Sequence, residues 1–219
     1  MSLAEHVEHT LLKPEATAAA IKQLCLEAKT YHLLGVCINP CYVSLAKSIL
    51  AGTPVKIVTV VGFPLGADIS AVKALAAAEA VKAGADEIDM VLNVGALQEG
   101  CLEAVTADIA AVVKAAAPKP VKVIIETCLL TDAEKVTACR MIAEAGAAFV
   151  KTSTGFNKGG ATVADVKLLA AEAHKLHLQV KAAGGIRDAA TARAMLEAGA
   201  DRLGTSAGVV IAKADTAAL

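Results

Sequence analysis

The sequence is poor in aromatic residues and carries no excess of charge of either sign. Its 219 residues include three Phe, two Tyr and no Trp, which argues against the stacking platforms that bind single-stranded nucleic acid. Its 21 Lys and Arg residues are balanced by 22 Asp and Glu residues, for a formal net charge of −1. Proteins that bind nucleic acid or anionic membranes need a basic excess, so we expect neither partner.

Long apolar runs and paired-cysteine motifs are also missing. No stretch approaches the roughly 18 uninterrupted apolar residues that a transmembrane helix needs, and residues 1–13 lack the apolar centre of a signal peptide. The six cysteines form no CxxC pair, and Cys37 with Cys41 alone is a weak metal motif. We therefore expect a cytoplasmic protein with reduced thiols and no bound metal.

Alanine-rich segments that close at a glycine recur along the chain. Hydrophobic residues make up 56% of the sequence, which is enough apolar surface to exclude disorder. The segments Lys82–Asp86, Glu144–Ala148 and Glu197–Asp201 each end a helical pattern at a glycine, and a β-type run follows each one. Glycine suits the left-handed position just after a helix, so this recurrence predicts repeated αβ units.

Eight apolar, β-branched runs are candidate strands. They are continuous rather than alternating, which is typical of parallel strands buried on both faces. Eight βα units in about 220 residues predict one (β/α)₈ TIM barrel, with a single domain over residues 1–219. A doubly wound sheet is the competing fold, but the Gly-Gly pairs at 159–160 and 184–185 do not complete a GxGxxG motif. The candidate strands are residues 8–12, 35–39, 56–62, 87–93, 121–127, 148–153, 178–183 and 202–206.

Three charged residues lie inside these apolar runs. Asp89, Lys151 and Lys181 fall in the fourth, sixth and seventh candidate strands, where a buried charge is costly. Because side chains alternate along a strand, Val150 and Val180 facing the helices would turn the two lysines into the barrel. Active sites of this fold lie at the carboxyl ends of the strands. We therefore take the three charged residues as candidate catalytic groups.

The two lysines lie on neighbouring strands, about 4.8 Å apart. Two ammonium groups about 5 Å apart repel by roughly 3 kcal/mol at an effective dielectric constant near 20. That repulsion would bring the pKa of one amine from about 10.4 to roughly 7–8, where it is a nucleophile at neutral pH. The residues leave open which lysine is neutral. The alternative is that each lysine is a core residue paired with a carboxylate such as Asp89 or Glu126.

Glycine-rich loops follow the last strands and predict a phosphate site. Loops after strands seven and eight, with a short helix beginning there, form the usual phosphate site of this fold. Glycines let backbone N–H groups approach an anion, and a serine adds a hydroxyl donor; the alternative is that these are ordinary turn glycines. The candidate substrate- and phosphate-binding residues are Thr10, Thr154, Gly155, Gly184, Gly185, Gly204 and Ser206.

These segments make the sequence resemble the deoxyribose-phosphate aldolases, over nearly the whole chain. The resemblance implies a metal-independent lyase without a cofactor, which reversibly cleaves 2-deoxy-D-ribose 5-phosphate to D-glyceraldehyde 3-phosphate and acetaldehyde. Sugar phosphates and aldehydes are then the small-molecule partners. The matching segments are His9–Pro14, Val60–Gly66, Glu87–Leu97, Lys151–Phe156, Lys181–Arg187 and Gly204–Val209.

The resemblance also implies a role for each candidate residue. Lys151 would form a Schiff base with the substrate carbonyl carbon, and Lys181 would keep that amine reactive and take part in proton transfer. Asp89 would exchange protons with the help of a water. Gly155, Gly184, Gly185, Gly204 and Ser206 would hold the phosphate. Some family members protonate the enamine with a C-terminal tyrosine, and the resemblance assigns that role to no residue here.

Two other functions use the same features. A transaldolase-like transferase or an isomerase barrel acting on another sugar phosphate would share the phosphate loops, but would need a different acid–base set or a longer acceptor pocket. A phosphosugar-binding barrel without catalysis would not need two strand lysines and Asp89. A homodimer is compatible with the sequence, which does not itself specify the oligomeric state.

Overall fold

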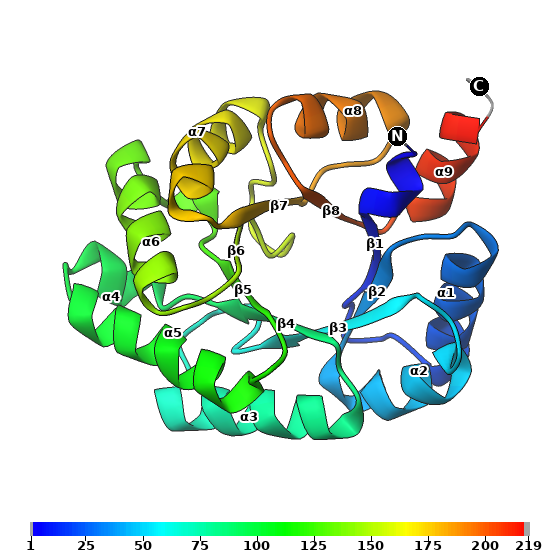
Figure 1. Ribbon diagram of the computed structural model, residues 1–219, viewed down its shortest axis with the longest axis horizontal. Helices are drawn as coiled ribbons and strands as arrows, with labels where there is room; N and C mark the ends of the chain where they lie inside the picture. Colours follow the sequence, from blue (N-terminus) through cyan, green and yellow to red (C-terminus); the bar gives the residue numbers. More distant parts are fainter. Residues whose placement is uncertain (1, 217–219) are drawn as a thin grey trace.

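The computed structural model describes residues 2–216 and contains a closed barrel of eight parallel strands. Each strand pairs with the next, and β1 pairs with β8 to close the barrel (Figure 1). The predicted TIM barrel is confirmed, and the doubly wound sheet is excluded. The strands are β1 (Val7–Leu11), β2 (Gly35–Ile38), β3 (Lys56–Val61), β4 (Glu87–Val91), β5 (Val121–Ile124), β6 (Phe149–Lys151), β7 (Gln179–Ala183) and β8 (Arg202–Thr205).

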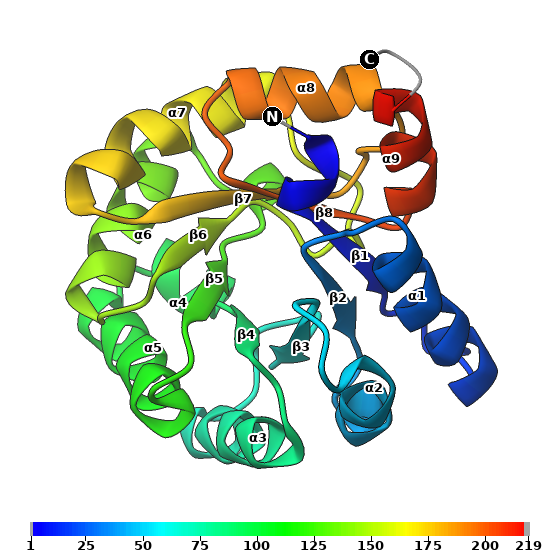
Figure 2. The ribbon, with the colours of Figure 1, turned by 45° about the vertical axis from the view of Figure 1, so that its right-hand side comes forward.

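Helices form the outer ring around the strands (Figures 1 and 2). The short helix α4, which follows β4, was not expected from the sequence. Short 3₁₀ helices are η1 (Leu3–His6), η2 (Pro40–Tyr42), η3 (Thr127–Leu129) and η4 (His174–Leu176). The α-helices are α1 (Ala18–Thr30), α2 (Val43–Leu50), α3 (Ser70–Ala83), α4 (Val94–Gln98), α5 (Leu102–Ala116), α6 (Asp132–Glu144), α7 (Val163–Ala173), α8 (Ala189–Glu197) and α9 (Gly208–Thr216).

The recurrent glycines end helices as the sequence predicts. Gly84, Gly146 and Gly199 follow α3, α6 and α8 with φ values of +112°, +78° and +106°. Side chains with a Cβ rarely adopt this left-handed conformation. At the other end of a helix, Thr131 and Glu134 form a capping box at the start of α6. Local sequence signals therefore set where the helices begin and end.

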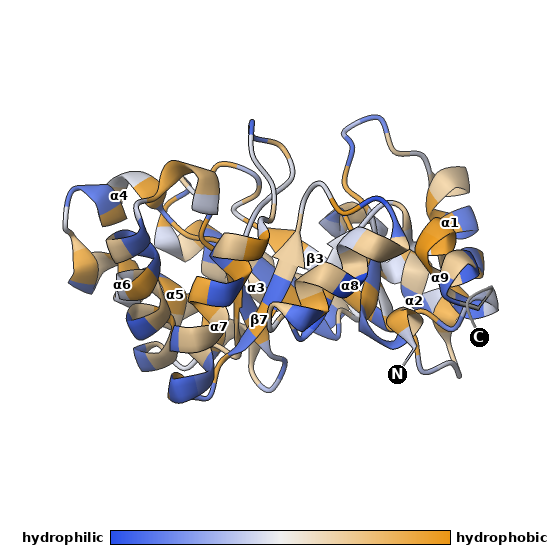
Figure 3. Cartoon of the chain, turned by 90° about the horizontal axis from the view of Figure 1, so that it is seen from above, coloured by the Kyte–Doolittle hydropathy of each residue, from blue (hydrophilic) through white to orange (hydrophobic). Residues whose placement is uncertain are grey.

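The main apolar core lies between the barrel and its helices. The outward side chains of the strands pack there against small helix residues such as Ala77, Ala80 and Ala138, and alanine lets helix and sheet approach closely. In Figure 3, apolar and polar residues alternate along the helices. Among the described residues, no helix is both long and apolar enough to cross a membrane.

The two ends of the barrel differ. In the side view of Figure 3, α4 and other segments that follow the strands project at the upper end, and the N-terminus lies at the lower end. There η1 is tied to α9, because the backbone N–H of Leu3 donates a hydrogen bond of 2.8 Å to Asp215. The end with the projecting loops is the end at which barrels of this type carry their active sites.

Candidate active site

Asp89, Lys151 and Lys181 meet inside the barrel. The Nζ atoms of Lys151 and Lys181 lie 2.8 Å and 2.6 Å from the same oxygen of Asp89, Oδ2. Lys151 and Lys181 are register partners on β6 and β7, so both side chains leave the same face of the sheet. All three side chains are buried. The inward orientation expected from strand alternation is therefore correct.

Lys181 is the ammonium ion of the pair. Burial opposes its charge, but Asp89 and Glu8 outweigh that cost and raise the pKa of Lys181. Its Nζ contacts the Glu8 carboxylate as well as Asp89. Burial likewise opposes the charge of Asp89, yet Lys122, Lys151 and Lys181 hold the pKa of that carboxyl well below its usual range. A fixed cation and a fixed anion thus lie beside Lys151.

A second layer of charges lies beneath these residues. Lys122 Nζ lies 2.6 Å from Glu87 and 2.9 Å from Asp89. Arg202 reaches Glu8 at 3.3 Å and Glu87 at 3.2 Å. Burial raises the pKa of Glu87, but Lys122 outweighs burial and lowers it to about 2. This layer was not expected from the sequence, although Glu87 lies two residues before Asp89 and so shares its face of β4.

The basic groups inside the barrel outnumber the carboxylates by one. Three cations face three carboxylates before Lys151 is counted, and Lys56 approaches Glu87 only from the partly exposed rim, at 2.7 Å. Lys151 is the fourth basic group beside these three carboxylates, and Asp89, at 2.8 Å, is its carboxylate partner among the described ion pairs. The three cations are Lys122, Lys181 and Arg202, and the carboxylates are Glu8, Glu87 and Asp89.

A cavity of about 440 Å³ opens above Lys151. Lys151 borders it, whereas Asp89 and Lys181 lie beneath and are not among its lining residues. The structure thus brings all seven predicted binding residues to the cavity that Lys151 enters. Those lining residues are Thr10, Thr154, Gly155, Gly184, Gly185, Gly204 and Ser206.

Glycine is required at several points of the cavity wall. Gly155, Gly184 and Gly185 have φ values of +81°, +86° and +81°, which other residues rarely adopt. A Cβ at Gly204 would lie 3.1 Å from Cε of Lys181, so glycine there makes room for the lysine. Arg187 also lines the cavity and adds positive charge. This wall suits a small anion.

Two residues named in the sequence analysis, Glu126 and Thr10, have hydrogen-bond partners of their own within the protein. Glu126, considered as a partner of the buried lysines, instead accepts hydrogen bonds from the backbone and the hydroxyl of Thr154. The reason is that the chain leaves β5 at Glu126 in a left-handed conformation, φ +54°. Thr10 lines the cavity, but its hydroxyl donates to the backbone carbonyl of Glu8 at 3.0 Å.

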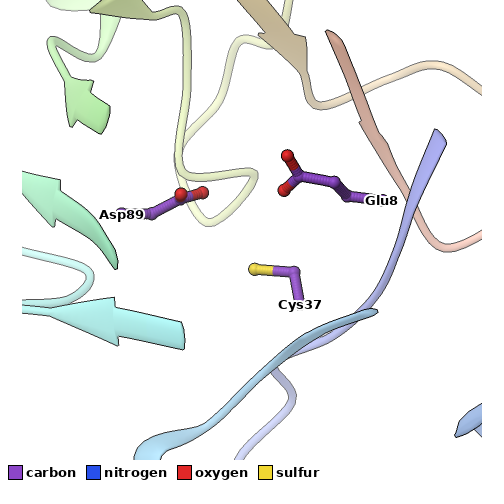
Figure 4. Close-up of side chains that lie close together, drawn as sticks. All are labelled: Glu8, Cys37 and Asp89. Atoms are coloured by element: carbon purple, nitrogen blue, oxygen red, sulfur yellow. The ribbon is translucent and has the colours of Figure 1, made fainter. Parts of the chain in front are cut away.

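Glu8, Cys37 and Asp89 are close enough to suggest a metal site, and their surroundings argue against one. Their ligand atoms lie within 4.8 Å of one another, and the three side chains converge in Figure 4. Both carboxylates, however, already bind lysine ammonium groups. Burial raises the pKa of the Cys37 thiol, which disfavours the thiolate that metals prefer. Cys41, its partner in the weak sequence motif, is exposed.

Comparisons with known proteins agree with this geometry. The family model for DeoC/LacD family aldolases matches residues 5–217. A deoxyribose-phosphate aldolase of Streptococcus pneumoniae serotype 4 is 57% identical over 217 residues, covering 99% of this chain and 98% of the relative. One from Streptococcus equi subsp. zooepidemicus is 54% identical, with the same coverage.

Solved structures of aldolases share the fold. QR15, an aldolase, superposes with a TM-score of 0.95 at 38% identity, covering 99% of this chain and 97% of that one. A deoxyribose phosphate aldolase from Aeropyrum pernix, described as having a unique tetrameric structure, gives a TM-score of 0.92 at 34% identity. It covers 99% of this chain and 92% of that one.

Proposed function

The chain belongs to the DeoC/LacD aldolase family, and from that premise we propose that it is a single-domain lyase acting through a Schiff base. Its reaction is the reversible cleavage of 2-deoxy-D-ribose 5-phosphate to D-glyceraldehyde 3-phosphate and acetaldehyde. The observation that carries the proposal is Lys151: it is a buried amine that borders the cavity, with the Lys181–Asp89 ion pair beside it. Its six thiols are free, which suits a reducing compartment such as the cytoplasm.

The neutral amine of Lys151 begins the reaction by attacking the aldehyde carbon of the substrate. A C–N bond forms, and the carbonyl oxygen becomes a hydroxyl by taking up a proton. Asp89, 2.8 Å from the lysine nitrogen, accepts the proton that the nitrogen loses and returns one when the hydroxyl leaves as water. The product is a protonated imine, which is an electron sink. Lys181, 2.6 Å from Asp89, favours the ionised carboxylate before the first transfer, so that Asp89 can accept the proton.

Cleavage follows from the imine. The hydroxyl on C3 gives its proton to Asp89 by way of a water, and a C=O bond forms at C3 as the C2–C3 bond breaks. The two electrons of that bond form the C=C bond of an enamine on Lys151. Glyceraldehyde 3-phosphate leaves, the enamine is protonated at carbon, and water releases acetaldehyde. The chemistry needs only this chain's own side chains and water.

The glycine wall holds the phosphate in this proposal. Backbone N–H groups at Gly155, Gly184, Gly185 and Gly204 and the hydroxyl of Ser206 approach the anion, and Arg187 supplies charge at the rim. Holding the phosphate at this edge leaves the aldehyde end of the substrate over Lys151. Binding energy from the phosphate then helps to orient the reacting carbon.

Product analysis tests the function. The protein incubated with 2-deoxyribose 5-phosphate should release equal amounts of acetaldehyde and glyceraldehyde 3-phosphate, and borohydride should inactivate it only when an aldehyde is present. A transaldolase-like enzyme would instead need an acceptor aldehyde to turn over, and an isomerase would keep all five carbons in one product. Either result would contradict the proposed cleavage.

We also propose that the chain forms a homodimer through α3. Its outer face exposes Ile69, Val72 and Leu75 at a spacing of three residues, with exposed fractions of 71%, 47% and 63%. An apolar helical stripe of this kind is typical of a surface that another molecule covers. The Aeropyrum pernix relative, which has the same fold, is described as tetrameric. Two copies of α3, antiparallel about Leu75, would place Asp68 opposite Lys82 of the partner subunit.

Sedimentation tests the dimer. The wild-type chain should sediment as a dimer at micromolar concentration, and Leu75→Asp should shift it to a monomer, because a charge would then be buried against its own symmetry copy. Val210→Asp, at an exposed apolar residue on α9, is the matched control and should leave the dimer intact. A monomeric wild type, or a Leu75→Asp variant that stays dimeric, would contradict the α3 interface.

A further inference from the structure

Glu126 is a buried carboxylate with an unusual backbone. Among the described residues, three non-glycine residues have positive φ: His32, Glu126 and His177. The two histidines are exposed, whereas Glu126 is 3% exposed and lies at the cavity end of β5. Its φ and ψ of +54° and +67° are left-handed. A non-glycine residue held in this conformation inside a protein points to a functional constraint.

Both oxygens of the Glu126 carboxylate accept hydrogen bonds from the same residue, Thr154. Its Oε1 accepts the backbone N–H of Thr154 at 3.3 Å, and its Oε2 accepts the Thr154 hydroxyl. The oxygen of that hydroxyl in turn accepts the backbone N–H of Phe156 at 3.1 Å. One carboxylate therefore fixes the backbone on both sides of Gly155, which lies between the two bonded residues.

The other end of the same loop is fastened to β7. The N–H of Ala161 donates to the carbonyl of Ala183, the last residue of β7, at 3.1 Å, and to the carbonyl of Gly184 at 3.0 Å. A Cβ on Gly160 would lie 2.5 Å from that carbonyl oxygen, and a Cβ on Gly184 would lie 3.7 Å from Cα of Gly155. The loop of residues 155–160 is thus held close against the Gly184 turn. Both loops line the cavity above Lys151.

We infer that Glu126 is a positioning residue for the phosphate end of the substrate. It acts through Thr154, whose hydroxyl and N–H it holds, and so sets where Gly155 stands relative to Gly184. The inference rests on the proposed function, because it assumes that these two glycines bind the phosphate. Lys151 is held separately, by Asp89 at 2.8 Å. The two ends of the substrate are therefore controlled by different carboxylates.

Glu126→Gly tests this role, because glycine keeps the left-handed backbone and removes both acceptors. We expect KM for 2-deoxyribose 5-phosphate to rise about tenfold or more, the effect of losing hydrogen bonds that preorganise a site. Cleavage of unphosphorylated 2-deoxyribose should change by less than about twofold. Glu126→Gln retains one acceptor oxygen and should recover part of the loss, and Thr154→Val should resemble Glu126→Gly.

Glu134→Ala is the matched control, because Glu134 accepts the N–H and the hydroxyl of Thr131 at 2.7 Å each, in a capping box on α6. It should lower stability without changing either KM. Equal losses on both sugars in Glu126→Gly and in Thr154→Val would mean a merely structural role and would overturn the inference, as would an unchanged KM. Borohydride trapping of acetaldehyde by the wild type is read separately, since its absence would refute the proposed function instead.

Discussion

Buried lysines occur in two regions of this protein, and only one region has the arrangement of an active site. Between the helices, Lys73 binds Asp108 at 2.6 Å and the Val91 carbonyl at 3.2 Å. Lys135 binds Asp165 at 2.6 Å and Asp132 at 2.9 Å. Each of these lysines has its own carboxylates, away from the cavity above Lys151. Burial opposes the charge of Lys135, but its two aspartates outweigh burial and raise the pKa of Lys135.

Inside the barrel, by contrast, three lysines share Asp89. Lys122, Lys151 and Lys181 all contact this one carboxylate. Lys122 has Glu87 as a further partner and Lys181 has Glu8. Lys151 has no second carboxylate among the described ion pairs, and it is the one of these three lysines that borders the cavity. Burial of a lysine therefore does not by itself indicate catalysis. A lysine that shares a carboxylate with other lysines and borders an open cavity does indicate it.

The largest expected effect is the loss of activity in Lys151→Ala. Removing the amine removes the Schiff base, so kcat/KM should fall by about 10³-fold or more. The fold should survive, because Asp89 keeps Lys122 and Lys181. Steady-state assays together with circular dichroism check both statements. Lys135→Met is the comparison in the helical layer and should keep full activity once folded.

Lys181→Met should have the next largest effect. It removes the cation beside Lys151 and leaves Glu8 and Asp89 with less positive charge nearby. Without that repulsion, we expect the pH needed for imine formation to rise. The rate near pH 7 should fall by about 10²-fold. A profile of unchanged shape would contradict the tuning role of Lys181.

The helical lysines should affect stability and not chemistry. Lys73→Met leaves Asp108 beside a buried apolar side chain, and breaking such a pair costs about 3–5 kcal/mol. Urea unfolding should report this loss, while kcat and KM at 25 °C stay at wild-type values. The double variant Lys73→Met/Asp108→Leu should recover most of the loss. If Lys73→Met lowers kcat in the folded protein, the distinction between the two regions is wrong.

The smallest expected effect is a dependence of stability on acid pH. The pKa of Glu87 is about 2 in the folded protein, against an ordinary value of 4.5. The unfolded chain therefore binds more protons between these values, and the stabilisation is present above pH 4.5 and lost as pH falls towards 2. It amounts to about 3 kcal/mol. Unfolding free energies at pH 6 and pH 3 should differ less in Glu87→Gln than in the wild type.

The sequence predicted the fold because its signals are local. Glycines after helices and continuous apolar runs each act over a few residues, and they located all eight strands to within three residues at each end. Strand alternation also turned Lys151 and Lys181 inward. The short helix α4 was not predicted because five residues are too few to show a helical hydrophobic periodicity.

The charge state of the site could not be predicted in the same way. Glu8 lies 173 positions before Lys181, and only closure of β1 onto β8 brings them together. Sequence reasoning on the lysine pair alone left open which amine is neutral. Similarly, Glu126 turns to Thr154 because of a left-handed residue at a strand end, and no sequence pattern indicates that conformation for a glutamate.

The site of the aldehyde adduct tests the central claim most directly. The protein is incubated with acetaldehyde and borohydride at pH 7, digested, and mapped by mass spectrometry at its buried lysines. We predict a reduced two-carbon adduct on Lys151 in stoichiometric amount, with Lys73, Lys122, Lys135 and Lys181 unmodified. An adduct on Lys181 or Lys122, or no adduct at all, would contradict the account.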